Sequence, residues 1–439
     1  MTIMRNSVLA FMPQALAIFT GILGSVITAR YLGPDGRGAL SIVLLSLMVL
    51  GMVGDFGLGQ AMTYIVSKRR LHARSALAFC VYAALVPGLM IAVLALAVWP
   101  VVADTVMQGV TLLTFQVSLL ALPAMLFNNL WIRMEMALGR FPVTMAMQSV
   151  HALGILGVTV GVLIVTDGGL HELVIGTVAV WVVTTLAMAV LSLVRHGIDP
   201  RVPRDALAEM RSYALRAYPG GLVNYSTLRF DLFVLNAYSG NAAVGQYSMA
   251  VTLTEKLWLI DSAAGQATMP EVIAREPREA AELTAATSRT IVLAAATLGG
   301  ALALVAPWVI GFLYGAEFLP AATALRILVP GVVLFAASRI LSQYQSGQLG
   351  RPGMASAVAF AVAAVSLVLY FALVPPYGYI GAAVASSIAY ATGFVINALI
   401  FRRFTGIGVI RVLVPTAEEV RRIAGVLGAV RRRLVGPRE

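Results

Sequence analysis

Residues 31–41 read YLGPDGRGALS, and residues 238–248 read YSGNAAVGQYS. At an offset of 207 positions, a tyrosine, two glycines and a serine coincide between the two stretches. A second match follows at an offset of 206, where DFGLGQA at 55–61 meets DSAAGQA at 261–267. Apolar composition alone does not place Asp, Gly and Gln in the same order twice. The matches therefore indicate that the chain consists of two related halves.

The composition places both halves in a membrane. Of the 439 residues, 59% are hydrophobic and only 12% are charged, whereas soluble domains carry about 25% charged residues. Runs of roughly 17–25 apolar residues indicate membrane spans, and we predict an all-α polytopic membrane protein with twelve of them. They lie near 8–30, 39–66, 75–100, 109–132, 143–166, 172–194, 215–238, 245–270, 288–314, 322–345, 354–374 and 379–401.

The charges of the connecting segments predict the orientation. Basic residues such as Lys68, Arg133, Arg201 and Arg275 occupy every second connection, and the alternate connections hold mostly acids. The positive-inside rule then places both termini in the cytoplasm. Because each half has an even number of spans, both halves share one orientation, as in transporters built from parallel repeats. We predict a six-helix bundle over 1–205, a second over 206–401, and a pseudo-two-fold axis along the membrane normal.

Residues 402–439 form a basic tail with nine arginines and three glutamates. Thr416 and Glu419 have the spacing of a capping box. Apolar residues then recur at helical spacing between 420 and 434, which predicts an amphipathic helix on the anionic cytoplasmic leaflet. Docking to a partner protein is the alternative. Membrane-flanking positions explain the net charge of +11 better than nucleic-acid binding does.

Three stretches carry a resemblance to a known family. Residues 29–45, ARYLGPDGRGALSIVLL, and 54–70, GDFGLGQAMTYIVSKRR, resemble the amino-terminal signature of oligosaccharide flippases of O-antigen and polysaccharide biosynthesis. Residues 228–260 resemble the start of the second half of these proteins. The family belongs to the multidrug/oligosaccharidyl-lipid/polysaccharide exporter superfamily. The resemblance extends over roughly residues 5–402.

The resemblance implies the MATE-like flippase fold with two parallel six-helix bundles. It also implies that the chain moves a polyprenyl-diphosphate-linked oligosaccharide across the bacterial cytoplasmic membrane by alternating access. Membrane lipids and enzymes of polysaccharide biosynthesis are the expected partners. A proton- or sodium-coupled multidrug exporter and a lipid II flippase are alternatives from the same superfamily. The short connections leave no room for a soluble catalytic domain, so we expect no enzymatic activity, and we expect no cofactor.

Ionisable residues at membrane depth are costly and usually face a cavity or a partner. The second half is rich in cations there, and arginine offers paired donors to the oxygens of a pyrophosphate. Arg229 and Asp231 correspond to Ile22 and Gly24 of the first half, so they break the repeat symmetry. The candidates for substrate binding are Arg229, Asp231, Lys256, Arg326, Arg339, Arg30, Asn128 and Asn129.

Each candidate also has a structural interpretation. Arg229 and Asp231 are two residues apart and face different sides of a helix, so each can pair with a neighbouring helix instead. Arg30 and Arg326 lie near outer ends of their spans, from which arginine side chains reach the interface. The two asparagines can join helices by hydrogen bonds.

Three acidic residues form a separate group with a coupling or structural role. Asp55 and Asp261 occupy matching positions of the repeat, which favours one shared role in both halves. Glu255 lies six residues before Asp261 in the same predicted span. No His, Cys, Asp and Glu residues have metal-ligand spacing, and the single cysteine, Cys80, excludes a disulfide within the chain.

Overall fold

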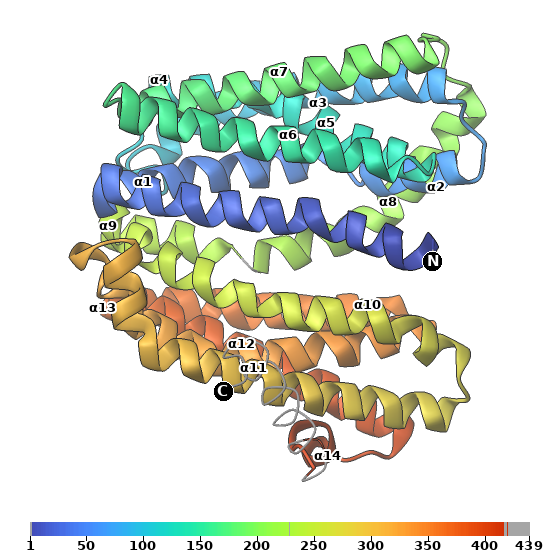
Figure 1. Ribbon diagram of the computed structural model, residues 1–439, viewed down its shortest axis with the longest axis vertical. Helices are drawn as coiled ribbons and strands as arrows, with labels where there is room; N and C mark the ends of the chain where they lie inside the picture. The colour runs from blue at the N-terminus through green and yellow to red at the C-terminus, as the bar shows by residue number, and fades with distance from the viewer. Residues whose placement is uncertain (1, 228, 417–418, 420–439) are drawn as a thin grey trace, which may run out of the picture. The chain divides into compact units, whose positions relative to one another are not determined.

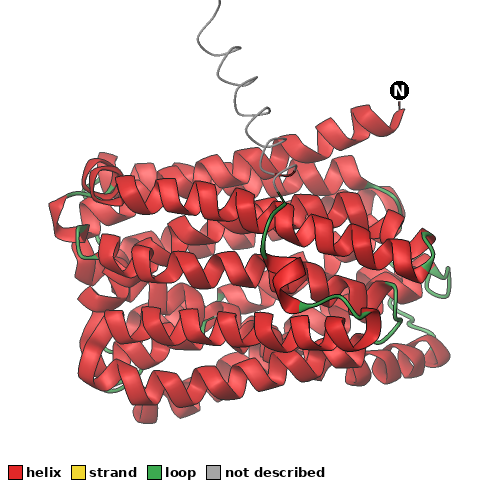
Figure 2. Ribbon diagram, turned by 90° about the horizontal axis from the view of Figure 1, so that it is seen from below, coloured by secondary structure: helices red, strands yellow, loops and turns green. Residues whose placement is uncertain are grey.

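The computed structural model describes residues 2–227, 229–416 and 419. Within these residues the regular secondary structure is entirely helical (Figure 2). The first helices are α1 (Thr2–Asp55), α2 (Leu58–Ser67), α3 (Ala73–Val102), α4 (Leu112–Leu119), α5 (Ala121–Ala137), α6 (Phe141–Val160), the π-helix η1 (Gly161–Val165) and α7 (Leu170–His196). The later helices are α8 (Arg204–Thr227), α9 (Phe230–Thr254), η2 (Glu255–Leu257), α10 (Trp258–Ala274), α11 (Pro277–Leu313), η3 (Ala316–Phe318), α12 (Ala321–Gly347), α13 (Pro352–Thr405) and α14 (Val409–Leu413) (Figure 1).

Eight helical segments of the described chain are long and apolar enough to cross a membrane. They are Leu16–Asp55, Ala73–Val102, Leu112–Ala137, Phe141–Val165, Leu170–His196, Pro277–Leu313, Ala321–Gly347 and Gly353–Thr405. About 20 residues suffice for one span, and the first and last of these segments have 40 and 53 residues. The chain is therefore a multi-pass membrane protein.

Three glycines divide long helices into two. Gly33 in α1, Gly240 in α9 and Gly378 in α13 have φ values of 63°, 74° and 54°. Such positive φ angles suit glycine, which lacks a Cβ atom. Gly33 and Gly240 are the glycines that coincide in the sequence repeat. A kink between two helices at each of them explains why both halves keep this glycine.

The chain forms two compact units. Unit 1 comprises Met1–Gly245 and Leu313–Glu317, and unit 2 comprises Gln246–Phe312 and Phe318–Glu439. This grouping follows the packing of the helices, whereas the predicted bundles 1–205 and 206–401 follow the sequence repeat. The predicted division stays a prediction.

Unit 1 has an apolar core with a polar clamp inside it. Trp131 of α5 is fully buried, and its indole N–H donates to Ser192 Oγ of α7 at 2.6 Å. The Ser192 hydroxyl donates to Glu135 Oε1 at 3.1 Å, and His196 Nε2 contacts the same oxygen at 3.1 Å. Arg140 completes the cluster with its guanidinium 3.8 Å from Glu135 Oε2. These contacts join α5 to α7 at their carboxyl-terminal ends.

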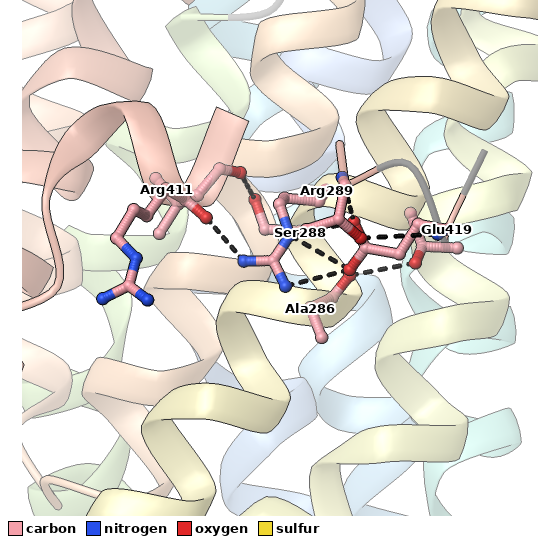
Figure 3. Close-up of polar contacts among 8 residues, drawn as sticks. Ala286, Ser288, Arg289, Arg411 and Glu419 are labelled. Atoms are coloured by element: carbon pink, nitrogen blue, oxygen red, sulfur yellow. Dashed lines mark hydrogen bonds and ion pairs between the residues drawn. The ribbon is translucent and has the colours of Figure 1, made fainter. Parts of the chain in front are cut away.

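Unit 2 holds the last described residues of the tail against α11 (Figure 3). Ser288 Oγ donates to the carbonyl of Val412 at 2.9 Å, and Arg289 donates to the carbonyl of Arg411 at 2.6 Å. Arg289 also pairs with Glu419 at 2.9 Å. The predicted capping box is confirmed, because Thr416 N–H donates to Glu419 Oε2 and Glu419 N–H donates to Thr416 Oγ1. The predicted amphipathic helix at 420–434 lies outside the described residues.

Candidate functional site

The first polar site of unit 1 lies where α1 ends. Asp55 is the last residue of α1, and α2 begins at Leu58 after two residues with positive φ, Phe56 (47°) and Gly57 (76°). The Asp55 carboxylate accepts the N–H of Gly59 at 3.3 Å and 3.4 Å. A carboxylate at this position satisfies a free N–H of the new helix and is favoured by the helix dipole. The broken helix thus fixes the acidic group in place.

Asn129 and Arg133 of α5 extend this site. Asn129 Nδ2 donates to Asp55 Oδ1 at 3.0 Å, and Arg133 Nε donates to Asn129 Oδ1 at 3.2 Å. The amide therefore relays a hydrogen bond between the carboxylate and the guanidinium. Asn129 and Arg133 are four residues apart, so one helix face presents both.

Gly59 makes room for this arrangement. A Cβ atom at Gly59 would lie 2.7 Å from Arg133 Nε and 2.9 Å from Arg133 Cδ. Both distances are well below an ordinary van der Waals contact, so Arg133 could not cross α2 over any larger residue. Glycine is required here for close approach and not for backbone conformation.

These groups line a cavity of about 410 Å³ in unit 1. The polar part of its wall comes from Asp55, Gln60, Asn128, Asn129 and Arg133. Two aromatic residues complete the wall, Trp181 of α7 and Tyr218 of α8. Tyr218 is held by a hydrogen bond from its hydroxyl to the carbonyl of Val53 at 3.1 Å. The cavity combines a carboxylate, amides, a guanidinium and aromatic rings in one place.

Unit 2 contains a more direct version of the same pair. Arg339 of α12 places Nη1 3.0 Å from Oδ2 of Asp261 on α10, and its Nη2 donates to Ser262 Oγ at 3.4 Å. The Asp261 side chain is fully buried, whereas 37% of the Arg339 side chain is exposed. The ion contact lies off the hydrogen-bond direction, so neither carboxylate oxygen receives a hydrogen bond from a described residue.

The two sites correspond residue by residue. Asp55 and Asp261 are 206 positions apart, and Arg133 and Arg339 are also 206 positions apart. Sequence reasoning missed Arg133 as the partner of Asp55, although this repeated offset was a usable signal. The bridging Asn129 corresponds to Phe335 at the same offset. The relayed pair thus has Asn129 where the direct pair has Phe335, and the two sites also differ at Phe56 and Ser262.

Two other predicted site residues bind backbone carbonyls. Arg30 Nε donates to the carbonyl of Leu313 at 2.8 Å, and Arg326 Nε donates to the carbonyl of Ala303 at 3.0 Å. Both side chains are exposed. Both carbonyls lack a helical partner, because Leu313 is the last residue of α11 and Ala303 lies four residues before Pro307, which has no N–H to donate. A role in substrate binding stays a prediction for both.

The remaining candidates lie near the start and end of α9. Arg229 is half-buried directly before the helix, and Asp231 is buried in its first turn. Glu255 and Lys256 are half-buried in η2, directly after α9. No group of three or more His, Cys, Asp and Glu residues that could hold a metal ion occurs among the described residues. None of these four is part of the Asp55 cavity.

Comparison with known proteins identifies the family. The model of the family described as "Polysaccharide biosynthesis protein" matches residues 27–323, which include both repeat signatures. The chain belongs to this family. A curated relative, the probable low-salt glycan biosynthesis flippase Agl15 of Haloferax volcanii, is 23% identical over 412 residues. That match covers 93% of this polysaccharide biosynthesis protein and 85% of the relative.

Solved structures show the fold that the polysaccharide biosynthesis protein shares with others. The lipid II flippase MurJ in an inward closed conformation matches with a TM-score of 0.73 and 13% identity, covering 90% of this chain and 87% of that one. An inward-facing MATE multidrug transporter of the MOP superfamily gives a TM-score of 0.71 and 16% identity, with coverages of 90% and 97%. These likenesses confirm the predicted MATE-like fold.

Proposed function

We propose that this polysaccharide biosynthesis protein is a flippase that moves a polyprenyl-diphosphate-linked oligosaccharide across the bacterial cytoplasmic membrane for surface polysaccharide synthesis. The family match and the relative that is named as a glycan biosynthesis flippase support this proposal. The likeness to a lipid II flippase and to multidrug transporters supports transport by alternating access rather than covalent catalysis.

Twelve membrane spans in two parallel six-helix bundles, with both termini in the cytoplasm, are part of this proposal. The positive-φ glycines support it, because Gly33, Gly240 and Gly378 each interrupt a helix between two predicted spans. Splitting α1 and α13 at Gly33 and Gly378 gives segments that correspond to apolar runs of the sequence, and Gly240 lies between the predicted spans 215–238 and 245–270. The shared offset of Gly33 and Gly240 supports parallel halves.

The cavity of unit 1 is the observation that carries the choice of substrate. Sugar hydroxyls are both donors and acceptors, and Asp55, Asn128, Asn129 and Arg133 offer both kinds of partner. Aromatic rings such as Trp181 provide an apolar surface for the C–H faces of a sugar ring. The positive charge of the Arg133 guanidinium would repel an organic cation in the same cavity. We therefore assign the sugar portion of the substrate to this cavity.

Arg339 is the proposed partner of the diphosphate. Its side chain is partly exposed and its charge is held by the buried carboxylate of Asp261. A guanidinium offers paired N–H donors to phosphate oxygens, and Asp261 would orient these donors before the lipid arrives. Arg229, Asp231, Lys256, Arg326 and Arg30 stay further candidates for substrate contact, and Glu255 stays a candidate for coupling. The coupling role that the sequence suggested for Asp55 is kept as part of the proposal.

The test uses a strain in which this gene is the sole source of the flippase. Deleting the gene should leave the lipid-linked oligosaccharide in the cytoplasmic leaflet, where a membrane-impermeant glycosidase or lectin added to intact spheroplasts does not reach it. Asp55→Asn and Arg133→Gln should reduce the accessible fraction at least tenfold at equal protein level. Arg195→Gln removes an exposed arginine of α7 outside the cavity, and it should export normally.

Normal leaflet distribution in the deletion strain would refute the proposed function. Acquired sensitivity of that strain to cationic drugs, with unchanged surface polysaccharide, would instead assign the protein to multidrug export. Accumulation of lipid II would assign it to peptidoglycan synthesis. Normal export by both cavity variants would leave the family activity standing but remove the assignment of the sugar site.

A further inference from the structure

A second, chemically different hollow lies beside the polar cavity in unit 1, where Phe56 of its wall contacts Tyr218 of the cavity with ring centroids 5.8 Å apart. It is a groove of about 660 Å³ between α2, α3 and α8. Its wall is almost entirely apolar and includes Phe79, Tyr82 and Val86 of α3 and Leu207 and Leu215 of α8. Tyr82, Val86 and Leu215 are exposed, so the groove opens to the surroundings of unit 1. It has no amide or carboxylate lining for sugar hydroxyls.

Two arginines of α8 border this apolar groove. Arg204 and Arg211 both line it, together with Leu207 and Leu215 of the same helix face. The spacing of three, four and four residues keeps all four side chains on one side of the helix. Both arginines are exposed, and neither forms an ion pair with a described residue. The nearby Glu209 is already paired with Arg70 at 2.6 Å.

The α3 side of the groove lies along a candidate membrane span. Helix α3 is a candidate membrane span that begins at Ala73, directly after the basic connection at 68–70. At 1.5 Å per residue, Val86 lies about 20 Å along the helix from Ala73. The groove therefore follows the span from its basic end to the level of lipid chains.

We propose that this groove binds an anionic phospholipid of the membrane. Its acyl chain lies against Tyr82, Val86 and Leu215, and its phosphate lies between Arg204 and Arg211. The charges favour an anionic phospholipid over other occupants. The apolar wall complements an acyl chain, and the two guanidinium groups at the border complement a negative headgroup. A zwitterionic lipid would fill the same groove without using the arginine pair. The groove shares no lining residue with the polar cavity.

The test measures lipid binding to the purified full-length protein in detergent. Thermal unfolding is followed by tryptophan fluorescence during titration with phosphatidylglycerol, phosphatidylcholine or polyprenyl phosphate. Phosphatidylglycerol should raise the unfolding temperature at lower concentration than phosphatidylcholine does. Each arginine near an anionic headgroup contributes about a fivefold factor in affinity. The double variant Arg204→Gln/Arg211→Gln should therefore bind phosphatidylglycerol about thirtyfold more weakly and lose the preference.

Two further variants separate the effect of the lining arginines from the effects of nearby charge and of the apolar groove. Arg201→Gln/Arg216→Gln removes the same charge close to the groove without touching its lining, and it should keep the preference. Ala208→Trp fills the groove and leaves both lining arginines in place, and it should lose binding. Native mass spectrometry of the unaltered protein, in which phosphatidylglycerol should be retained over phosphatidylcholine, provides a measurement that needs no variant.

Equal retention of the two phospholipids would overturn the proposal. A preference that survives in Arg204→Gln/Arg211→Gln would also overturn it. Stabilisation by polyprenyl phosphate alone would assign the groove to the transported lipid instead of a membrane phospholipid.

Discussion

Replacing either member of the Asp261–Arg339 pair should lower the stability of the protein, and the two substitutions should lower it by different amounts. Asp261 is fully buried in unit 2, and 37% of the Arg339 side chain is exposed. Arg339→Gln leaves a buried carboxylate without its cation, whereas Asp261→Asn leaves a cation that can turn towards water. The arginine variant should therefore be clearly the less stable of the two.

The geometry sets the size of the difference. Breaking a fully buried ion pair costs about 3–5 kcal/mol, and losing a hydrogen bond to a charged group costs about 1.5–3 kcal/mol. Arg339 is partly exposed and its contact lies off the hydrogen-bond direction. We therefore expect Arg339→Gln to lower the free energy of unfolding by about 2 kcal/mol. For Asp261→Asn we expect about 1 kcal/mol or less. The double variant should resemble Asp261→Asn, which gives a coupling energy of about 2 kcal/mol, the whole effect of Arg339→Gln.

Tryptophan fluorescence during thermal unfolding of the purified protein is the suitable assay. Trp258 lies one helical turn before Asp261 and packs on Phe335, with ring centroids 5.3 Å apart. Phe335 in turn lies one turn before Arg339 on α12. Among the five tryptophans of the chain, Trp258 therefore reports on the contact between α10 and α12 at the site of the substitutions. Equal unfolding temperatures for the two single variants, or additive effects in the double variant, would show that the pair is not energetically coupled.

Three further predictions concern unit 1 and the tail. Glu135→Ala should destabilise unit 1 by about 2–3 kcal/mol, because it removes the acceptor that joins α5 to α7. A maleimide should then label the buried Cys80 at a lower temperature than in the unaltered protein. Unchanged labelling would contradict the stabilising role of Glu135. Gly59→Ala should abolish export at normal expression by displacing Arg133, whereas Gly157→Ala, where a Cβ atom meets nothing within 4 Å, should export normally. Burial raises the pKa of Glu419, but hydrogen bonds from Arg289 and Thr416 outweigh it and hold this pKa below its ordinary value. The contact between Glu419 and Arg289 is therefore fully stabilising above about pH 4.3 and is lost as the pH falls through the lowered pKa. Hydrogen exchange of α14 should be faster at pH 3 than at pH 6 after correction for intrinsic rates. Equally slow exchange at both pH values would refute this prediction.

The general architecture was readable from the sequence because it depends on strong and local signals. Long apolar runs predict helices, and the repeated Gly33 and Gly240 are the points where helices kink. The capping box of Thr416 and Glu419 was also predictable, since its two residues are close in sequence.

The polar sites were only partly predictable. Asp55, Asn129 and Arg339 were named as candidates from their charge or polarity alone. Their partners come from other helices, and sequence distance does not determine which side chains meet across a helix contact. Arg30 and Arg326 illustrate the limit, because each binds a backbone carbonyl of α11, a helix distant from it in sequence or reached across a turn, and sequence distance does not reveal that contact.

The substitution of one bridging side chain has a consequence for how the two halves diverged. Each half retains an acid and a base, and the two halves are offset by 206 positions. The first half has Asn129 between its acid and its base, and the second has Phe335 at the corresponding position. The copy with the amide has water-sized space beside its carboxylate and can exchange partners there. The copy with the aromatic ring keeps its charges in direct contact. The repeat thus carries the same acid and base in both halves, while the side chains around them leave one pair beside a cavity and hold the other in direct contact.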